Sequence, residues 1–363
     1  MKILYITNGI KGAGGLERVL SVKASYLAEQ LGHEVHILTL NHRATPLFYS
    51  FSSKIQLHDI EVSGNPFTYV RLYRKGIIQT MHSIQPDVIS VCDDGLKAFF
   101  LPMLLPKIPL VYERHVSKQI AFGANPSWLK KISVALQLQL MNILGRYFDQ
   151  FVVLTQDNLN EWNLPNAVVI PNPLSFYPET QAELTNKTVI AVGKHTHQKG
   201  FDRLLNCWAT IVKTNPDWSL EIYGKFDEQH SLQKLAKQLN IENSVRFFEP
   251  DPDIATRFLN ASVFAFSSRF EGFGMVLIEA MACGVPCVSF DCPCGPSDII
   301  RSGEDGFLVP NHNTEAFTQQ LMQLIENREL RLKMGAQAKI NVKRYLPEVV
   351  VKQWDELFKS LAI

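Results

Sequence analysis

Short apolar runs alternate with longer stretches of helical period along the whole chain. In the first half, runs of Val, Ile and Leu without polar alternation predict strands that are covered on both faces. These runs are Ile3–Thr7, Val35–Leu40, Val88–Val91, Leu110–Glu113, Phe151–Leu154 and Ala167–Ile170. Helices are expected between them, notably Gly15–Leu31 and about Ser127–Phe148. This alternation predicts a parallel, doubly wound sheet.

The segment "IPNPL", Ile170 to Leu174, interrupts the pattern and indicates a hinge, because proline continues neither a helix nor a central strand. The alternation then restarts, with predicted strands at Val189–Val192, Leu220–Tyr223, Val245–Phe248, Val263–Phe266, Pro286–Ser289 and Phe307–Val309. We expect an α/β fold of two Rossmann-like, doubly wound domains, 1–171 and 172–345, that face each other across a ligand-binding cleft. The amphipathic stretch within 346–363 is expected to form a helix that packs back towards the N-terminal domain.

Composition narrows the class of protein. Of the 363 residues, 46% are hydrophobic and 20% charged, which is typical of a globular protein with well-built cores. The net charge of +1 gives no global field towards nucleic acid, so no nucleic-acid partner is expected. No apolar run reaches the roughly 18 residues of a spanning helix. The start "MKILYITNGI" resembles a buried strand more than a secretion signal. We therefore expect a cytoplasmic protein.

Four of the six cysteines, Cys283, Cys287, Cys292 and Cys294, lie close together in the sequence. They lack the C-x-x-C spacing of a zinc site, so we interpret them as small core-filling residues. Disulfides are not expected in a cytoplasmic chain.

The stretch "RFEGFGMVLIEAMACG", Arg269 to Gly284, contains two carboxylates eight residues apart. Glycines before a helix let the backbone approach a ligand, and the helix amino terminus offers free N–H groups, so this turn suits a phosphate. Glu279, one turn further in, could accept two hydrogen bonds from a vicinal diol such as a ribose. The alternative is that Glu279 pairs internally and fixes packing. Glu271 would face whatever projects beyond the phosphates.

Two further loops follow predicted strands at the edge where doubly wound sheets bind ligands. "VGKHTHQKGF" carries Lys194 and Lys199, which could neutralise a pyrophosphate or simply lie on a solvated surface. "YERH" ends in His115, which could donate a hydrogen bond to a substrate, move a proton, or serve structure alone. "NGIKGAGGLERV" places a glycine-rich turn that includes Gly15 before the first helix. Its spacing is not G-x-G-x-x-G, so dinucleotide binding is disfavoured.

Together these residues resemble a known family. "FEGFGMVLIEAMACGVPCVS" is similar to the E-x7-E motif of retaining, family-4-type glycosyltransferases with the GT-B fold. "VGKHTHQKG" resembles their donor-phosphate loop, "NGIKGAGGLERV" their first turn, "IPNP" their hinge and "CPCGPSDIIRSGEDGFLVP" their usual continuation. These matches spread from Asn8 to Pro310, and thus over nearly the whole chain.

The resemblance implies a role for each matching residue. Domain 1–171 would bind the acceptor and 172–345 the nucleotide sugar. Glu279 would bind the donor ribose, and Glu271 and His115 would contact the sugar. Lys199 would stabilise the leaving diphosphate. The residues that assist it would be Gly15, Lys194, Gly272, Phe273, Gly274 and Met275. The family commonly has Arg where Lys194 stands, so at this position a point charge replaces a bidentate phosphate contact.

The resemblance also implies a reaction. A hexose or N-acetylhexosamine would pass with retention from a nucleoside-diphosphate sugar, by resemblance a UDP-sugar, to a saccharide or lipid-linked saccharide. Cell-surface polysaccharide synthesis would use such a step. Fixed cations and helix amides would stabilise the leaving group, so no cofactor and no metal are expected. Two rival interpretations stay open: a nucleotide-sugar 2-epimerase of the same architecture, and a non-catalytic nucleotide-sugar-binding protein.

Two basic and apolar stretches of the N-terminal domain could contact a membrane. They are "FTYVRLYRKGIIQTM", Phe67 to Met81, and "WLKKISVALQLQLMNILGRYF", Trp128 to Phe148. Aromatic residues beside Lys and Arg suit a helix at the inner face of the cytoplasmic membrane, whereas apolar helices more often belong to a core. Both interpretations, peripheral membrane contact and burial, are open from the sequence.

Overall fold

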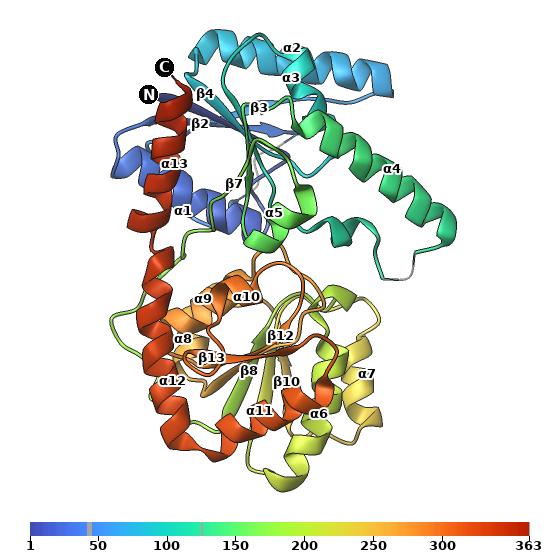
Figure 1. Cartoon of the computed structure of the whole chain (residues 1–363), viewed down its shortest axis with the longest axis vertical. Helices are drawn as coiled ribbons and strands as arrows, with labels where there is room; N and C mark the ends of the chain where they lie inside the picture. Colours follow the sequence, from blue (N-terminus) through green and yellow to red (C-terminus); the bar gives the residue numbers. More distant parts are fainter. Residues whose placement is uncertain (42–45, 125, 363) are drawn as a thin grey trace. The chain divides into compact units, whose positions relative to one another are not determined.

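A computed structural model describes residues 1–41, 46–124 and 126–362 of the chain (Figure 1). Its contacts divide the chain into two units. Unit 1 comprises Met1–Ser175 with Pro347–Ile363, and unit 2 comprises Phe176–Leu346. Each unit contains one sheet in which all strand pairs are parallel, so the α/β fold predicted from strand–helix alternation is confirmed.

Unit 1 is built on a seven-stranded sheet of order β3-β2-β1-β4-β5-β6-β7. Its strands are β1 (Lys2–Thr7), β2 (Glu34–Leu40), β3 (Gln56–Ile60), β4 (Val88–Cys92), β5 (Leu110–Glu113), β6 (Gln150–Val153) and β7 (Ala167–Val169). Its helices are α1 (Gly15–Glu29), α2 (Pro66–Ile84), η1 (Leu96–Phe100), α3 (Leu101–Leu104), η2 (Lys118–Ala121), α4 (Trp128–Gly145), α5 (Gln156–Trp162) and α13 (Pro347–Leu361). The sequence did not predict β3, because the segment "QLHDI" is a partly exposed edge strand without an apolar run.

The C-terminal helix α13 belongs to unit 1, although the whole of unit 2 lies between it and the rest of unit 1 in the sequence. It packs beside α1, and both helices are seen next to each other in Figure 1. Val350, Val351, Trp354 and Phe358 join a core that also contains strand residues such as Tyr5. An amphipathic stripe at positions i, i+1, i+4 and i+8 accounts for this burial.

Unit 2 is built on a six-stranded sheet of order β10-β9-β8-β11-β12-β13. Its strands are β8 (Thr188–Val192), β9 (Ser219–Tyr223), β10 (Val245–Phe248), β11 (Val263–Phe266), β12 (Cys287–Asp291) and β13 (Gly306–Pro310). Its helices are η3 (His197–Lys199), α6 (Phe201–Thr214), α7 (Ser231–Gln238), α8 (Ile254–Leu259), α9 (Met275–Ala282), α10 (Pro296–Ile299), α11 (Thr314–Glu326), α12 (Arg328–Asn341) and η4 (Val342–Tyr345). The strand order reverses between β8 and β11, so their carboxyl ends form the switch point where such sheets bind ligands.

Across the described part of the chain, no helix is both long and apolar enough to cross a membrane. Helix α4 nevertheless carries apolar side chains on two faces. Val134, Leu138 and Met141 are buried, whereas Ile132, Leu136 and other large apolar residues are exposed on the opposite side.

Candidate functional site

Two loops of unit 2 meet at the switch point of its sheet. The first follows β8 and contains η3, and the second follows β11 and leads into α9. Across them, Lys199 Nζ donates a hydrogen bond to Glu271 Oε1 at 2.7 Å. The Lys199 side chain is 20% exposed and that of Glu271 7%, so solvent reaches the pair mainly from the lysine. The structure thus brings together two of the three residues predicted for catalysis.

Polar contacts between the two loops fix this pair. The Arg269 N–H donates to the Gln198 carbonyl oxygen at 2.7 Å, and Gln198 Nε2 donates to the Phe270 carbonyl oxygen at 3.1 Å. The Arg269 guanidinium also donates to both carboxylate oxygens of Asp202, at 2.8 and 2.6 Å. Partial burial opposes ionisation, but Arg269 outweighs it and holds the pKa of Asp202 below its usual range. Because a bidentate pair has little freedom, the loops are held in one register.

Arg203, at the start of α6, donates hydrogen bonds to backbone carbonyl groups at the start of the second loop. Its Nε donates to the Ser267 carbonyl oxygen at 2.7 Å, and its Nη2 donates to that of Ser268. The guanidinium carbon also lies 3.7 Å from the centre of the Phe290 ring. Burial lowers the pKa of Arg203 to about 10, so the side chain remains a cation at neutral pH. The carbonyl groups at the end of β11 are therefore satisfied by a buried charge.

Glycines allow the close approach of these loops. Gly200 has a φ of +62°, and a Cβ on it would lie 2.1 Å from the Ser267 carbonyl oxygen. Gly295 has a φ of +134°, and a Cβ on it would lie 1.8 Å from the Phe273 carbonyl oxygen. A side chain would clash with backbone at both positions, and both residues have a positive φ that favours glycine, so the loop that carries Glu271 depends on these two glycines.

The other predicted donor-site residues of unit 2 lie on the same loop and helix. Gly272, Phe273 and Gly274 precede α9, which begins at Met275. Phe273 is almost fully buried and packs edge-on against Tyr345, with ring centres 5.6 Å apart, so its ring serves packing. Glu279 is fully buried on α9. A ribose could reach its carboxylate only after neighbouring side chains move.

The lysines and histidines of the first loop differ in burial. Lys194 is exposed, in contrast to Lys199. His195 is buried, and its ring packs against Phe201, Phe226 and Phe247 with ring centres 5.0 to 5.8 Å apart. Burial lowers the pKa of His195, so the ring is neutral at neutral pH. An aromatic environment of this kind makes His195 a core residue.

In unit 1, the glycine-rich turn encloses an acidic side chain that the sequence reasoning did not consider. A Cβ on Gly12 or on Gly14 would lie 2.4 Å from a carboxylate oxygen of Glu17, in the first turn of α1. At Gly15 the same construction meets nothing within 4 Å. A diphosphate approaching Gly12 or Gly14 would therefore meet a negative charge, whereas the space beside Gly15 is open.

His115 follows β5 and belongs to a buried polar cluster. Glu113 Oε2 contacts both Lys23 Nζ and His115 Nε2, the latter at 3.1 Å, and Glu113 Oε1 accepts a hydrogen bond from Ser90 Oγ at 2.5 Å. The side chains of Lys23 and Glu113 are each 1% exposed. The sequence analysis did not single out Lys23, although its position could have indicated a buried ion pair. Lys23 lies on the apolar face of α1 together with Val19 and Leu27, where a lysine needs a charged partner.

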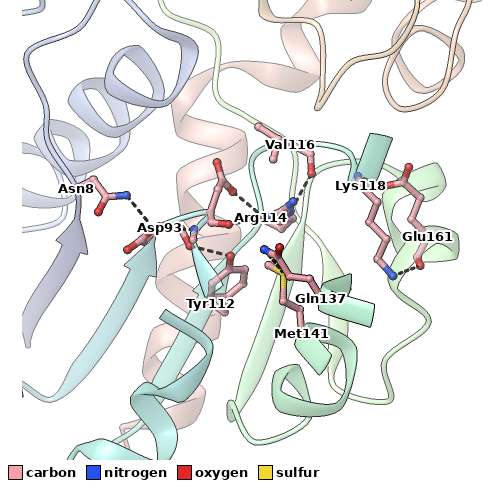
Figure 2. A network of polar contacts seen from close by, with 11 residues as sticks. Asn8, Asp93, Tyr112, Arg114, Val116, Lys118, Gln137, Met141 and Glu161 are labelled. Atoms are coloured by element: carbon pink, nitrogen blue, oxygen red, sulfur yellow. Dashed lines mark hydrogen bonds and ion pairs between the residues drawn. The ribbon is translucent and has the colours of Figure 1, made fainter. Parts of the chain in front are cut away.

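The same edge of the sheet carries a second polar network, shown in Figure 2. Asn8 Nδ2 donates to Asp93 Oδ1, and the Tyr112 hydroxyl donates to the Asp93 carbonyl oxygen, both at 2.8 Å. Arg114 Nε donates to the Val116 carbonyl oxygen at 3.0 Å. These bonds tie together the segments that follow β1, β4 and β5.

A pocket of about 430 Å³ opens at this edge of unit 1. It lies at the carboxyl ends of β1, β2 and β4, and polar and apolar residues both line it. The lining includes Asn8, Lys11, Glu17, Asn41 and Asp94. Amide and carboxylate groups of this kind match the hydroxyl groups of a saccharide.

Among the described residues, one group of side chains lies close enough to share a metal ion: Cys92, Glu113 and His115, with ligand atoms within 4.8 Å of one another. The Lys23 ammonium already contacts the same Glu113 carboxylate, and it would repel a cation placed there. The cysteines near the β12 strand do not belong to this group. All six cysteines are buried, as expected of core-filling residues.

Two doubly wound parallel units with these loops define the GT-B class of fold, and comparison with solved structures agrees. The sucrose-phosphate synthase of Thermosynechococcus elongatus superimposes with a TM-score of 0.82 at 19% identity, over 99% of this chain and 98% of that one. The Anabaena protein HepE, solved in complex with UDP and glucose, gives a TM-score of 0.80 at 20% identity, over 99% and 100% of the two chains. The predicted fold class is therefore confirmed.

Sequence relatives define the family. The amylovoran biosynthesis glycosyltransferase AmsD of Erwinia amylovora is 31% identical over 374 residues, which cover 98% of this chain and 99% of that protein. An uncharacterized glycosyltransferase of Haemophilus influenzae is 30% identical over 97% of this chain and 98% of its own. The family model for glycosyl transferases group 1 matches residues 177–341. The chain belongs to this family of glycosyltransferases.

Proposed function

We propose that this chain transfers a hexose or N-acetylhexosamine from a UDP-linked sugar to a saccharide or lipid-linked saccharide, with retention of configuration. The observation that carries the proposal is the Lys199–Glu271 pair at the switch point of unit 2. Relatives support it, because AmsD is named for amylovoran biosynthesis and HepE was solved with UDP and glucose. Synthesis of a cell-surface polysaccharide is the corresponding role.

The proposed chemistry follows from the charges of the pair. Cleavage of the sugar–phosphate bond leaves negative charge on the departing diphosphate and positive charge on the sugar. The Lys199 ammonium, the more exposed partner, would turn from Glu271 to the diphosphate and stabilise it. Glu271 would then accept hydrogen bonds from sugar hydroxyl groups near the reacting carbon. In this mechanism side-chain cations and helix amides carry the charge, so the proposal includes no metal and no cofactor.

The remaining donor contacts are assigned by the same logic. Helix α9 begins at Met275 without a side-chain cap, and the Leu277 N–H donates to the Gly274 carbonyl oxygen at 2.9 Å. The N–H groups before Leu277 would bind a phosphate together with Gly272 and Gly274. Lys194 would add an exposed charge, and Glu279 would bind the ribose once neighbouring side chains have moved. Gly15 and His115 of unit 1 would approach the diphosphate and the sugar.

The acceptor would enter unit 1. The pocket near Asn8 and Asp94 suits a saccharide, and helix α4 suits a lipid surface. The exposed apolar residues of α4 and the turn after it, the α4 apolar face, are Trp128, Leu129, Ile132, Leu136, Leu140, Ile143 and Tyr147. Lys130 and Lys131 lie on the same helix and are exposed. We propose that this face lies at the inner surface of the cytoplasmic membrane while a lipid-linked acceptor is elongated.

A two-stage experiment tests the proposed function. A thermal-shift screen over nucleoside-diphosphate sugars should first identify the donor, because a preferred ligand raises the melting temperature of the fold that it binds. The chain is then incubated with this donor, with and without lipid-linked saccharides. Sugar transfer that needs the acceptor, with an unchanged anomeric configuration in the product, is the expected result. Epimerisation of the donor without an acceptor, or binding with no turnover on any acceptor, would overturn the proposal in favour of its two rivals.

A further inference from the structure

The buried side chains around Glu113 determine which nitrogen of His115 carries its proton. Burial alone would raise the pKa of Glu113, but Lys23 and His115 outweigh it and lower this pKa to about 2. The carboxyl group is therefore ionised at neutral pH and offers only acceptor oxygens. The nitrogen of His115 that faces it at 3.1 Å, Nε2, must then be the donor.

The tautomer of His115 follows from this assignment. A neutral imidazole carries one proton, so a proton on Nε2 leaves a lone pair on Nδ1. Nδ1 of His115 is buried and has no hydrogen-bond partner within the described residues. The whole side chain is 6% exposed, so water gives little compensation. A buried acceptor in this state is complete only when a ligand donates to it.

Lys23 is held in place beside Glu113 by two aromatic rings, and the thiol and phenol groups nearby are neutral. The Lys23 ammonium lies 3.8 Å from the centre of the Trp354 ring on α13 and 5.1 Å from that of Tyr5 on β1, which fixes its position against Glu113. Burial raises the pKa of the Cys92 thiol and of the Tyr5 hydroxyl well above their ordinary values, so both are neutral. Lys23 is thus the charge that balances Glu113.

We propose that Lys23 and Glu113 are positioning residues that hold His115 in its Nε2–H tautomer, so that Nδ1 accepts a hydrogen bond from a sugar hydroxyl group. This inference rests on the proposed function for the identity of the ligand. It changes the role of His115, since the sequence reasoning allowed the ring to donate to the substrate. It also makes the C-terminal helix part of the site, because Trp354 covers Lys23.

Ring ¹⁵N NMR of the full chain, labelled on histidine, reads the tautomer directly. In the wild type we expect a proton on Nε2 and a bare Nδ1 for His115. The double variant Lys23→Met/Glu113→Gln removes both charges without leaving either buried alone. Because the side-chain amide introduced at position 113 can donate or accept, we expect a mixture of tautomers, a fall in kcat of about tenfold, and unchanged UDP affinity.

Asp355→Asn is the matched control, because Asp355 Oδ1 lies 2.7 Å from His33 Nε2 in the same unit. It should alter the ring signals of His33 and leave kcat and the tautomer of His115 unchanged. A wild-type His115 with its proton on Nδ1 would overturn the inference, and this spectrum needs no variant to fold. A double variant with the wild-type tautomer and kcat would overturn it equally.

Substrate analogues test the acceptor role of Nδ1. Each hydroxyl group of the donor found in the thermal-shift screen is replaced in turn by hydrogen or by fluorine. An acceptor nitrogen gains nothing from fluorine, so at one position both analogues should bind about equally more weakly than the parent donor in isothermal titration. His115→Ala should then bind the parent donor as weakly as the two analogues. Binding is measured because fluorine also withdraws electrons from the reacting carbon and slows transfer by itself. A fluoro analogue that is clearly better than the deoxy analogue would mean that His115 donates, which contradicts the inference. If no donor supports transfer at all, the proposed function fails, while the NMR spectra still decide the tautomer.

Discussion

Both units carry a Glu–Lys pair at the carboxyl edge of a parallel sheet, but the two pairs differ in burial. In unit 1 the side chains of Lys23 and Glu113 are each 1% exposed, whereas in unit 2 Lys199 is 20% exposed. A fully buried pair cannot exchange its partner for a ligand, because the charge left behind would be stranded. A lysine open to solvent can make that exchange. The fully buried pair therefore positions a neighbour, whereas the pair with the partly exposed lysine is suited to contact a substrate.

The sharpest test of this comparison is the loss of the exposed lysine. Lys199→Ala should lower kcat by about a thousandfold, because it removes the cation proposed to stabilise the leaving diphosphate. The free energy of unfolding should fall by about 1–3 kcal/mol, because the buried Glu271 carboxylate loses its hydrogen-bond partner. This loss is smaller than the one expected at Lys23, since Lys199 is partly exposed. Steady-state kinetics and urea unfolding measure both quantities. Lys199→Arg, which keeps the charge, is the control, and near-normal turnover in the alanine variant would contradict a role at the diphosphate.

The buried pair should behave in the opposite way. Lys23→Met leaves the Glu113 carboxylate uncompensated in the core, so the free energy of unfolding should fall by about 3–5 kcal/mol. Lys23→Met/Glu113→Gln should recover most of this loss, because no charge remains buried. Urea unfolding of the two variants gives the difference. A single variant as stable as the wild type would show that Lys23 does not balance Glu113.

Acid should weaken unit 1 through the same carboxylate. The pKa of Glu113 is lowered from 4.5 to about 2 in the folded chain, so folding is favoured wherever the group is ionised. This contribution is fully present above pH 4.5 and is lost as the pH falls towards 2. It amounts to at most about 3 kcal/mol for a shift of this size. Urea unfolding across this range should show a smaller loss in Lys23→Met/Glu113→Gln than in the wild type, and equal losses would exclude the linkage.

Glu279 offers an intermediate case, a fully buried carboxylate predicted to bind a ligand. Glu279→Ala should weaken UDP binding by about 2–3 kcal/mol through the loss of charged hydrogen bonds to the ribose. Isothermal titration with UDP and with uracil separates this role from packing, because uracil lacks the ribose and should bind both forms equally. Unchanged UDP affinity would leave Glu279 as a packing residue only.

The sequence was most informative where one pattern decides the structure. Apolar runs such as Leu110–Glu113 and Val263–Phe266 matched their strands residue for residue, and the amphipathic stretch after Leu346 formed α13. Strand β3 was missed because an edge strand with polar residues has no such run. The second carboxylate–lysine pair was missed for a different reason: Glu113 and Lys23 are 90 residues apart, and only the fold brings them together.

The sequence predicted which residues belong to the site, but it did not predict which of them contact one another. The spacing of Lys199 and Glu271 on two loops after parallel strands indicated one edge of a sheet, and the structure adds the hydrogen bond between them. The sequence could not reveal that Glu17 lies in the glycine-rich turn or that Arg203 holds the carbonyl groups after β11. Such contacts depend on backbone conformation at single residues, which no periodicity encodes.

The smallest expected effect on stability comes from the α4 apolar face. Ile132 and Leu136 are 52% and 61% exposed, so Ile132→Ser/Leu136→Ser should change the free energy of unfolding by less than about 0.5 kcal/mol. Binding to vesicles that contain anionic lipid should nevertheless fall by about tenfold or more, because each apolar side chain inserted into a lipid surface contributes about 1–2 kcal/mol. Co-sedimentation with vesicles measures this. Leu57→Ser is the matched control, since Leu57 is a similarly exposed leucine on β3, at 48%. If the control weakens vesicle binding as much as the α4 variant, the contact is non-specific and α4 has no special part in it.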